Sequence, residues 1–368
     1  MQSRISAVTA IGLALGGFVG CGGLAAQDSS EAGEGGERDV GAPDGGSTRD
    51  GGIHRLPEGG SSDSAVDAPG GDSTVERVTL TLASMLLHAG VIAVDSTSVY
   101  CGTYDSLVKV PLAGGTVTTL ATNAPADKFT VRTGLAVDSE SVYWDDNTAQ
   151  AVLKVPIGGG KTTTLARTAY LGGYFNLAID ATSVYWGDET GSLGAVRSVP
   201  LGGGAPANLT KTKLRKAMTD YAVAVAVDTT NVYWTDPNAH ALLTVPIGGG
   251  ATATLASGLK NPGGIAVDAT RAYWTDITAG TVMSVPLAGS KPTTLASGQG
   301  TPLGIAVDGA SVYWTDESAG TVMKIPRDGG ATTTLHSGSG APWGIAVDAT
   351  SVYWSDDRDW TLMKVTPK

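Results

Sequence analysis

One stretch that recurs along the chain decides the fold, and its clearest copy, residues 304–338, reads GIAVDGASVYWTDESAGTVMKIPRDGGATTTLHSG. It holds four short runs rich in β-branched and aromatic residues: GIAV, SVYWTD, TVMKIP and TTTLHS. Residues typical of turns separate the runs, so the pattern predicts four short antiparallel strands. Gly-rich turns such as Gly248–Gly250 in another copy supply the positive φ that a tight hairpin between the third and fourth strands needs.

The unit occurs seven times between residues 75 and 368. Its first strand ends in an aspartate in every copy: Asp95, Asp138, Asp180, Asp228, Asp268, Asp308 and Asp348. The intervals between these residues are 43, 42, 48, 40, 40 and 40, a spacing typical of propeller blades. A single four-stranded sheet is not stable alone, but seven sheets stacked around an axis bury one another's faces. The sequence therefore predicts an all-β fold, a seven-bladed β-propeller over residues 75–368.

The ring closure is visible in the order of the strands. The seventh copy stops after its third strand, at Met363-Lys364-Val365, and lacks a fourth. The missing pattern stands at the front of the domain instead, where Val78–Ala83 reads VTLTLA and matches the TTTLAS of other copies. We expect this N-terminal strand to complete the last blade.

The second strands carry a family resemblance. The letters YWTD stand at Tyr233–Asp236, Tyr273–Asp276 and Tyr313–Asp316, with YWDD, YWGD and YWSD in other copies. Together with GIAVD, these letters resemble the YWTD/NHL class of propellers, found in low-density-lipoprotein-receptor ectodomains and in bacterial surface proteins. YWTD receptor propellers usually have six blades, whereas seven copies occur here. No EGF-like cysteines flank the repeats either, so the resemblance implies the fold and not a receptor function.

The first 21 residues have the features of an export signal. Arg4 precedes a mostly apolar run from Ile5 to Gly20 that is too short to span a membrane. The run ends in Phe18-Val19-Gly20-Cys21, which resembles the lipobox of bacterial lipoproteins and implies lipidation of Cys21. The alternative is ordinary cleavage near Ala25 or Ala26, with Cys21 removed. We therefore expect an exported protein of the bacterial cell envelope, an outer-membrane or cell-surface lipoprotein held by a lipid anchor.

Residues 22–74 have the composition of a spacer. They contain 14 Gly, 11 Asp or Glu and 3 Arg, and no aromatic residue. Such a segment buries too little apolar area to offset its ordering entropy, so it is expected to be disordered. Its charge, 3 − 11 = −8, accounts for most of the net charge of −11. An acidic chain of this kind argues against a nucleic-acid partner.

The repeated aspartates are interpreted as scaffold. An Asp that opens a tight turn accepts hydrogen bonds from the backbone two residues on, and the seven first-strand aspartates fit that role in every blade. The six second-strand aspartates receive the same interpretation: Asp146, Asp188, Asp236, Asp276, Asp316 and Asp356. The alternative, a metal site, is not favoured, and no metal or cofactor is expected. Cys101 replaces the repeated Trp in the first copy and is expected to be a small buried hydrophobe.

The connections divide into a uniform set and a variable set. Connections from second to third strands, and from fourth strands to the next copy, share one face, called here the variable face. Eight aromatic residues outside the repeated positions fall there: Tyr104, Phe129, Tyr170, Tyr174, Phe175, Tyr221, Trp343 and Trp360. The longest connections are 121–133, 166–176 and 209–222, and the last holds a basic cluster of Lys211, Lys213, Arg215 and Lys216. Packing anchors and solvated loops are the alternatives to a binding surface.

Two functions follow from these residues. The favoured hypothesis is a surface-tethered, non-catalytic binding or scaffolding module for a glycan, a peptide or a surface protein. Its predicted ligand-binding residues are Tyr170, Tyr174, Phe175, Tyr221, Lys216, Trp343 and Trp360. The alternative is a propeller-type hydrolase or lyase with a site at the mouth of the central channel. In that case His88 and His336 would converge, with Asp357 and Asp359 as neighbours. We find no hydrolase or phosphate-loop motif and assign no catalytic residue.

Overall fold

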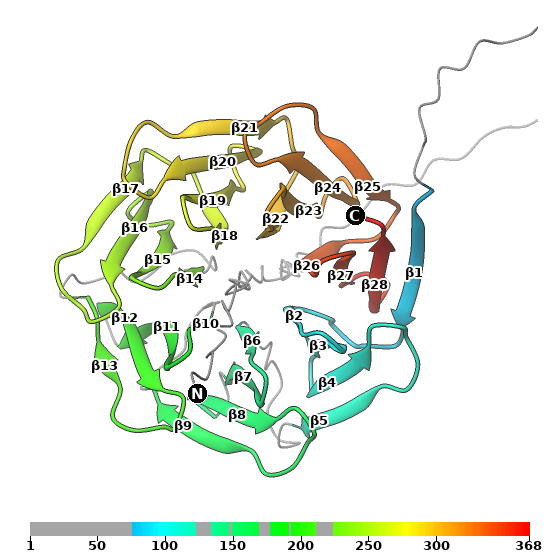
Figure 1. Cartoon of the computed structure of the whole chain (residues 1–368), viewed down its shortest axis with the longest axis horizontal. Coiled ribbons are helices and arrows are strands. Elements are labelled where there is room, and N and C mark those ends of the chain that lie inside the picture. Colours follow the sequence, from blue (N-terminus) through cyan, green and yellow to red (C-terminus); the bar gives the residue numbers. More distant parts are fainter. Residues whose placement is uncertain (1–75, 123–133, 147–148, 169–176, 191–192, 211–223) are drawn as a thin grey trace, which may run out of the picture. The chain divides into compact units, whose positions relative to one another are not determined.

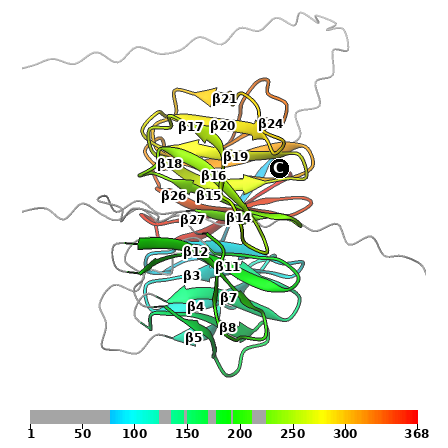
Figure 2. The same ribbon diagram turned by 90° about the vertical axis from the view of Figure 1, so that its left-hand side faces the viewer.

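The fold of the repeat region is a ring of β-sheets. A computed structural model of the chain describes residues 76–122, 134–146, 149–168, 177–190, 193–210 and 224–368. These residues form seven four-stranded antiparallel sheets, and Figure 1 shows the sheets standing radially around a common axis. The strands of the blades run between the two faces of the ring (Figure 2). The prediction of a seven-bladed β-propeller is confirmed. Among the described residues, no helix is long and apolar enough to cross a bilayer.

Each blade runs from an inner first strand to an outer fourth strand. Blades 1 to 3 comprise β2 (Ile92–Val94), β3 (Ser98–Gly102), β4 (Ser106–Pro111) and β5 (Thr118–Thr122); β6 (Leu135–Val137), β7 (Ser141–Asp146), β8 (Ala151–Pro156) and β9 (Thr163–Arg167); and β10 (Leu177–Ile179), β11 (Ser183–Thr190), β12 (Leu193–Pro200) and β13 (Ala207–Asn208). Blades 4 and 5 comprise β14 (Val225–Val227), β15 (Asn231–Asp236), β16 (Ala241–Pro246) and β17 (Ala253–Ser257); and β18 (Pro262–Val267), β19 (Arg271–Asp276), β20 (Thr281–Pro286) and β21 (Thr293–Ser297). Blades 6 and 7 comprise β22 (Pro302–Val307), β23 (Ser311–Asp316), β24 (Thr321–Pro326) and β25 (Thr333–Ser337); and β26 (Pro342–Val347), β27 (Val352–Asp356), β28 (Thr361–Thr366) and the N-terminal β1 (Val78–Ala83).

The N-terminal strand closes the ring as expected. β1 pairs antiparallel with β28, from Val78 opposite Thr366 to Ala83 opposite Leu362. The inner strand of each blade contacts the inner strand of the next, and β26 of blade 7 contacts β2 of blade 1. Blade 7 is thus built from both ends of the domain, and the circle of blades has no gap.

Tryptophans from the second strands fill the spaces between blades. Trp314 of blade 6, for example, is fully buried in a cluster with Tyr273 and Val282 of blade 5. Where blade 1 meets blade 7, Cys101 replaces the indole and is fully buried, as predicted. Leu86 and Ala89, which follow β1, belong to the same apolar cluster as Cys101. The segment after the closing strand therefore adds apolar volume at the one junction whose repeat lacks a tryptophan.

The threonine of the YWTD sequence joins neighbouring blades. The Thr315 hydroxyl accepts the Gly304 N–H of its own inner strand at 3.0 Å and donates to the Trp343 carbonyl of blade 7 at 2.7 Å. The same donation to the next inner strand is made by three more residues: Thr235 to Gly263, Thr275 to Leu303 and Ser355 to Gly90. Each buried bond contributes about 0.5–1.5 kcal/mol.

These hydroxyl bridges run around only part of the ring. They lead into blades 5, 6, 7 and 1. In blades 1, 2 and 3 the corresponding residues are Gly102, Asp145 and Gly187. These blades precede the three longest connections, 121–133, 166–176 and 209–222, so the longest connections follow the blades whose repeat lacks the bridging hydroxyl.

The first-strand aspartates are scaffold, as interpreted from the sequence. In blade 4, Asp228 Oδ1 accepts the N–H groups of Thr230 and Asn231 at 2.6 and 2.7 Å. Its Oδ2 accepts the Tyr233 hydroxyl at 2.7 Å, and the Tyr–Asp pair recurs in all seven blades. Burial alone would raise the pKa of Asp228, but these hydrogen bonds outweigh it and hold the pKa below its usual value. Each pair thus locks the turn between the first two strands.

Candidate functional site

Most of the predicted ligand-binding residues lie outside the part of the chain that the structure describes. Two of them are described, namely Trp343 and Trp360, whereas Cys21 and the remaining five are not: Tyr170, Tyr174, Phe175, Lys216 and Tyr221. Trp343 lies on the inner strand β26, and only 7% of its surface is exposed. Trp360 lies in the turn between β27 and β28 and is 41% exposed. Of the two, only Trp360 presents a broad apolar surface to solvent.

Trp360 occupies a position with a fixed backbone role. Its φ is +53°, and its carbonyl accepts the Leu86 N–H at 2.9 Å. The equivalent residues of other blades have the same positive φ, between 48° and 63°, and the same kind of bond to the chain after the fourth strand: Gln150 to Thr168, His240 to Leu259, Gly280 to Gln299 and Gly320 to Gly338. The scaffold therefore requires the left-handed backbone here and leaves the side chain free to vary.

The ideal residue at this position is glycine. A left-handed backbone disfavours any side chain by about 1–2 kcal/mol, and a Cβ at Gly280 or Gly320 would collide with the carbonyl of its hydrogen-bonding partner. Blades 5 and 6 have glycine at this position, whereas blade 7 has Trp360, which carries the largest of all side chains. Blades 2 and 4 also carry side chains at this left-handed position, Gln150 and His240, and the exposed indole of Trp360 is the largest of the three side chains.

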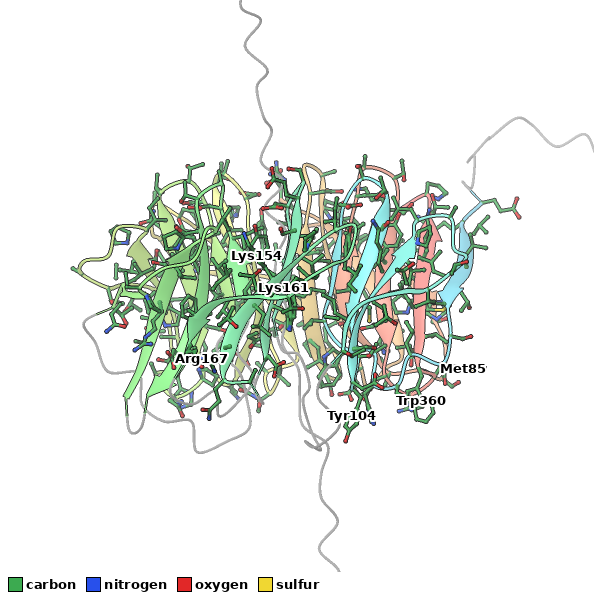
Figure 3. All side chains as sticks on the ribbon, turned by 90° about the horizontal axis from the view of Figure 1, so that it is seen from below. Met85, Tyr104, Lys154, Lys161, Arg167 and Trp360 are labelled. Carbon is green, nitrogen blue, oxygen red and sulfur yellow. The ribbon has the colours of Figure 1, made fainter. Side chains whose placement is uncertain are left out.

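Trp360 belongs to a group of exposed and half-buried residues where the two ends of the folded domain meet. We name this group the ring-closure patch, and it comprises Met85, Leu87, His88, Tyr104, Asp357 and Trp360. Met85 is 86% exposed and Leu87 44%. Figure 3 shows Met85, Trp360 and Tyr104 projecting from the same face of the ring. Met85 and His88 also have positive φ, 59° and 50°, so three of the six residues stand in the strained left-handed region.

His88 is the centre of the patch. Its Nδ1 lies 3.2 Å from Oδ1 of Asp357. Its ring lies 5.9 Å from that of Tyr104 and 6.2 Å from that of Trp360, measured between centroids. The Tyr104 N–H donates to the Leu87 carbonyl at 2.9 Å, which holds the blade 1 turn against the closing segment. The patch is thus a polar His–Asp pair with an aromatic ring on either side and aliphatic side chains nearby.

Glu317 lies beside the patch. It follows the second strand of blade 6, at the position that Asp357 holds in blade 7, and it is half-buried. Burial, and next the negative charge of Asp357, raise the pKa of Glu317. The equivalent Ile277 of blade 5 reaches towards Gly263, where the inner strand begins. The carboxylates of Glu317 and Asp357 therefore lie close enough for the charge of Asp357 to act on Glu317.

The residues of the predicted enzyme site are only partly together. His88 meets Asp357 as the alternative hypothesis expected, but His336 lies on β25 and packs against Trp354 with ring centroids 4.9 Å apart. Burial lowers the pKa of His336. The Asp359 N–H donates to Asp356 at 3.0 Å. Within the described ranges, neither a hydrogen bond nor a ring contact links His336 to His88, and we find no group of His, Cys, Asp and Glu suited to a metal ion.

The comparisons with known proteins agree on the fold. The chain resembles virginiamycin B lyase from Staphylococcus aureus, solved as a catalytically inactive variant with quinupristin: the TM-score is 0.64 with 15% identity over 79% of this chain and 99% of the lyase. A chain of a nidogen–laminin complex matches with a TM-score of 0.53 and 22% identity over 68% of this chain and 97% of that one. The designed protein Ika8 matches with a TM-score of 0.56 and 14% identity, over 78% and 98%.

Sequence comparison finds no matching protein-family model and no matching curated protein. The structural similarities are all below 25% identity and show that the chain is a β-propeller repeat protein. Because they include both an enzyme and a component of a protein complex, the fold alone does not choose between catalysis and binding.

Proposed function

We propose that this protein is a tethered binding module that recognises another protein through the ring-closure patch. The observation that carries the proposal is Trp360. An indole replaces glycine at a strained backbone position and remains 41% exposed. Exposed aromatic residues clustered with other apolar side chains are characteristic of protein interfaces. One of the similar structures is a component of a protein complex, which supports this use of a propeller.

The composition of the patch favours a protein partner over a glycan. A sugar would use the two aromatic rings and the His88–Asp357 pair, but it would gain little from Met85 and Leu87, which are 86% and 44% exposed. Methionine adapts to irregular apolar surfaces and is enriched at protein interfaces. The predicted ligand-binding residues of the connection 166–176, namely Tyr170, Tyr174 and Phe175, lie outside the described residues.

Substituting Trp360 tests the proposal. Trp360→Gly is expected to raise the melting temperature or leave it unchanged, because it relieves a strain of about 1 kcal/mol. Binding should fall by at least about tenfold, as for an interface hot spot. The full-length chain is screened against a displayed library of short random peptides and against a glycan array. The affinity of each retained probe is then measured for the wild type and for Trp360→Gly.

His240→Gly is the matched control, because His240 occupies the same left-handed position in blade 4. It should gain the same stability and keep full binding. Peptides that bind both variants equally, or retention of glycans alone, would contradict a protein-binding patch. Loss of folding in Trp360→Gly would contradict the view that this side chain is dispensable to the scaffold.

The tether is the second part of the proposal. The sequence of the signal-like segment and the composition of the acidic spacer support a propeller that is tethered to the bacterial envelope, with Cys21 as the lipidated residue. In a bacterium that exports lipoproteins, the wild-type chain should incorporate a clickable palmitate analogue, and Cys21→Ser should not. Equal incorporation by both chains, or by neither, would contradict lipidation of Cys21 and would leave the proposal for the ring-closure patch unaffected.

A second candidate function, a lyase or hydrolase, is favoured by the His88–Asp357 pair. A carboxylate that holds the Nδ1 of histidine is the arrangement that orients Nε2 as a general base, and one similar structure is a lyase. An enzyme would lose turnover in His88→Ala, whereas the binding module retains peptides that depend on Trp360.

A further inference from the structure

We propose that the partner presents a basic side chain, lysine or arginine, next to an apolar one, and that Glu317 and Asp357 receive the basic group. This inference rests on the proposed function and adds the chemistry of the partner. Glu317 borders the ring-closure patch on its blade 6 side, and Asp357 belongs to the patch, so charge complementarity favours a basic occupant.

Glu317 is the first observation. Within the described part of the chain, no hydrogen bond and no ion pair engages its carboxylate, although the residue is half-buried. Its position is fixed by the backbone, since its N–H donates to the Thr301 carbonyl at 3.0 Å. A half-buried carboxylate without a hydrogen bond or an ion pair is unfavourable for the free protein. The raised pKa of Glu317, caused by burial and then by the charge of Asp357, has the same origin.

The charge of Arg358 favours the ionised form of Glu317, but burial and the charge of Asp357 outweigh it, and the pKa of Glu317 is raised. The guanidinium of Arg358 donates to the Ser339 carbonyl, and this residue forms none of the ion pairs of the described chain. His88 contacts Oδ1 of Asp357 and leaves Oδ2 available. Two further acids, Asp105 and Asp359, are exposed in the neighbouring turns. The border of the patch is therefore acidic and has room for an added positive charge.

The aromatic rings suit the same ligand. The rings of Tyr104 and Trp360 lie 5.9 and 6.2 Å from the His88 ring, measured between centroids. The faces of such rings attract cations by about 0.5–1 kcal/mol at exposed sites. Lysine and arginine also carry long aliphatic stems that pack on apolar surface. A basic side chain that crosses Trp360 to reach Asp357 and Glu317 would satisfy both features, while a neighbouring apolar side chain covers Met85 and Leu87.

Charge-removing variants test the inference in the full-length chain. Peptides selected from a displayed random library should be enriched in Lys or Arg next to an apolar residue. Glu317→Gln and Asp357→Asn should each weaken these peptides by about tenfold, and binding should weaken further as salt is raised. Glu317→Gln should fold at least as stably as the wild type, because it removes a repelled charge. Replacing the basic residue of a selected peptide by glutamine should remove the difference between Glu317→Gln and wild type.

Glu140→Gln is the matched control. It makes the same change of charge in an exposed turn between first and second strands, on the face opposite the patch, and should leave binding unchanged. Selected peptides that lack basic residues, bind equally to Glu317→Gln and are lost in Trp360→Gly would overturn this inference and leave the proposed function intact. Peptides that bind Trp360→Gly as tightly as the wild type would contradict the proposed function itself.

Discussion

A chain lacking residues 75–84 is expected to lose its cooperative thermal transition or to melt roughly 8 °C lower than the intact protein, as follows from about 5 kcal/mol and an unfolding entropy of about 2.1 cal/mol/K per residue. The deletion removes β1, whose five pairs with β28 complete blade 7, at about 1 kcal/mol for each hydrogen bond. It also removes Leu82, which is buried at the junction of blades 7 and 1. Differential scanning fluorimetry and circular dichroism of the two purified chains measure the effect.

A deletion of similar size in the acidic spacer, residues 40–49, is the control and should leave the melting temperature unchanged. If the chain without residues 75–84 melts at the wild-type temperature, then β1 does not carry the closure of the ring. Adding back a synthetic peptide of residues 75–84 should restore part of the lost stability, because the vacant edge of β28 is the complement of that strand.

Raising the pH above 10 is expected to unfold the propeller in one steep transition that is complete by about pH 12. Burial, and next the hydrogen bond to Asp180, raise the pKa of Tyr185 from 10.0 to about 12. The pKa values of the six other paired tyrosines are raised for the same reasons. Unfolded tyrosines release their protons near pH 10 and folded ones do not, so the free energy of unfolding falls as the pH rises. Each Tyr–Asp pair can lower the free energy of unfolding by at most about 1.4 kcal/mol per pH unit.

The measurement is chemical denaturation at a series of pH values, with tyrosinate absorbance recorded in parallel. Absorbance should rise together with the loss of β structure, and the slope of stability against pH should approach one proton for each pair. Tyr185→Phe should lower that slope by one proton. Tyrosinate that forms while the blades remain folded would show that the pairs do not protect the phenols.

The fold is predictable from the sequence because each blade repeats the same information. Seven aspartates at regular intervals, the paired Tyr and Trp residues and the displaced strand Val78–Ala83 fix the number of blades and the closure. The role of the YWTD threonine was not anticipated. Its hydroxyl joins inner strands of neighbouring blades, and a contact between repeats leaves no trace in the pattern within one repeat.

The candidate site is only partly predictable, because exposure cannot be read from residue type. Leu86 and Leu87 are adjacent and identical in chemistry, yet Leu86 is buried and Leu87 is 44% exposed. Trp343 and Trp360 both stand outside the repeated positions, but only Trp360 is presented to solvent. One signal was present in the repeat itself: Gly280 and Gly320 align with Trp360, so a large aromatic side chain stands where two other blades have glycine.

The ring-closure patch draws its residues from the beginning and the end of the folded domain, at residues 85–88 and 357–360. A recognition surface at this patch, as proposed, would form only when the last blade has been synthesised and the two ends of the domain have met. In the proposed function, only a completely folded chain would bind its partner, and a truncated or nicked chain would not. A partner seated across this seam would in turn clamp the two ends together, so occupancy would slow the first step by which the ring comes apart.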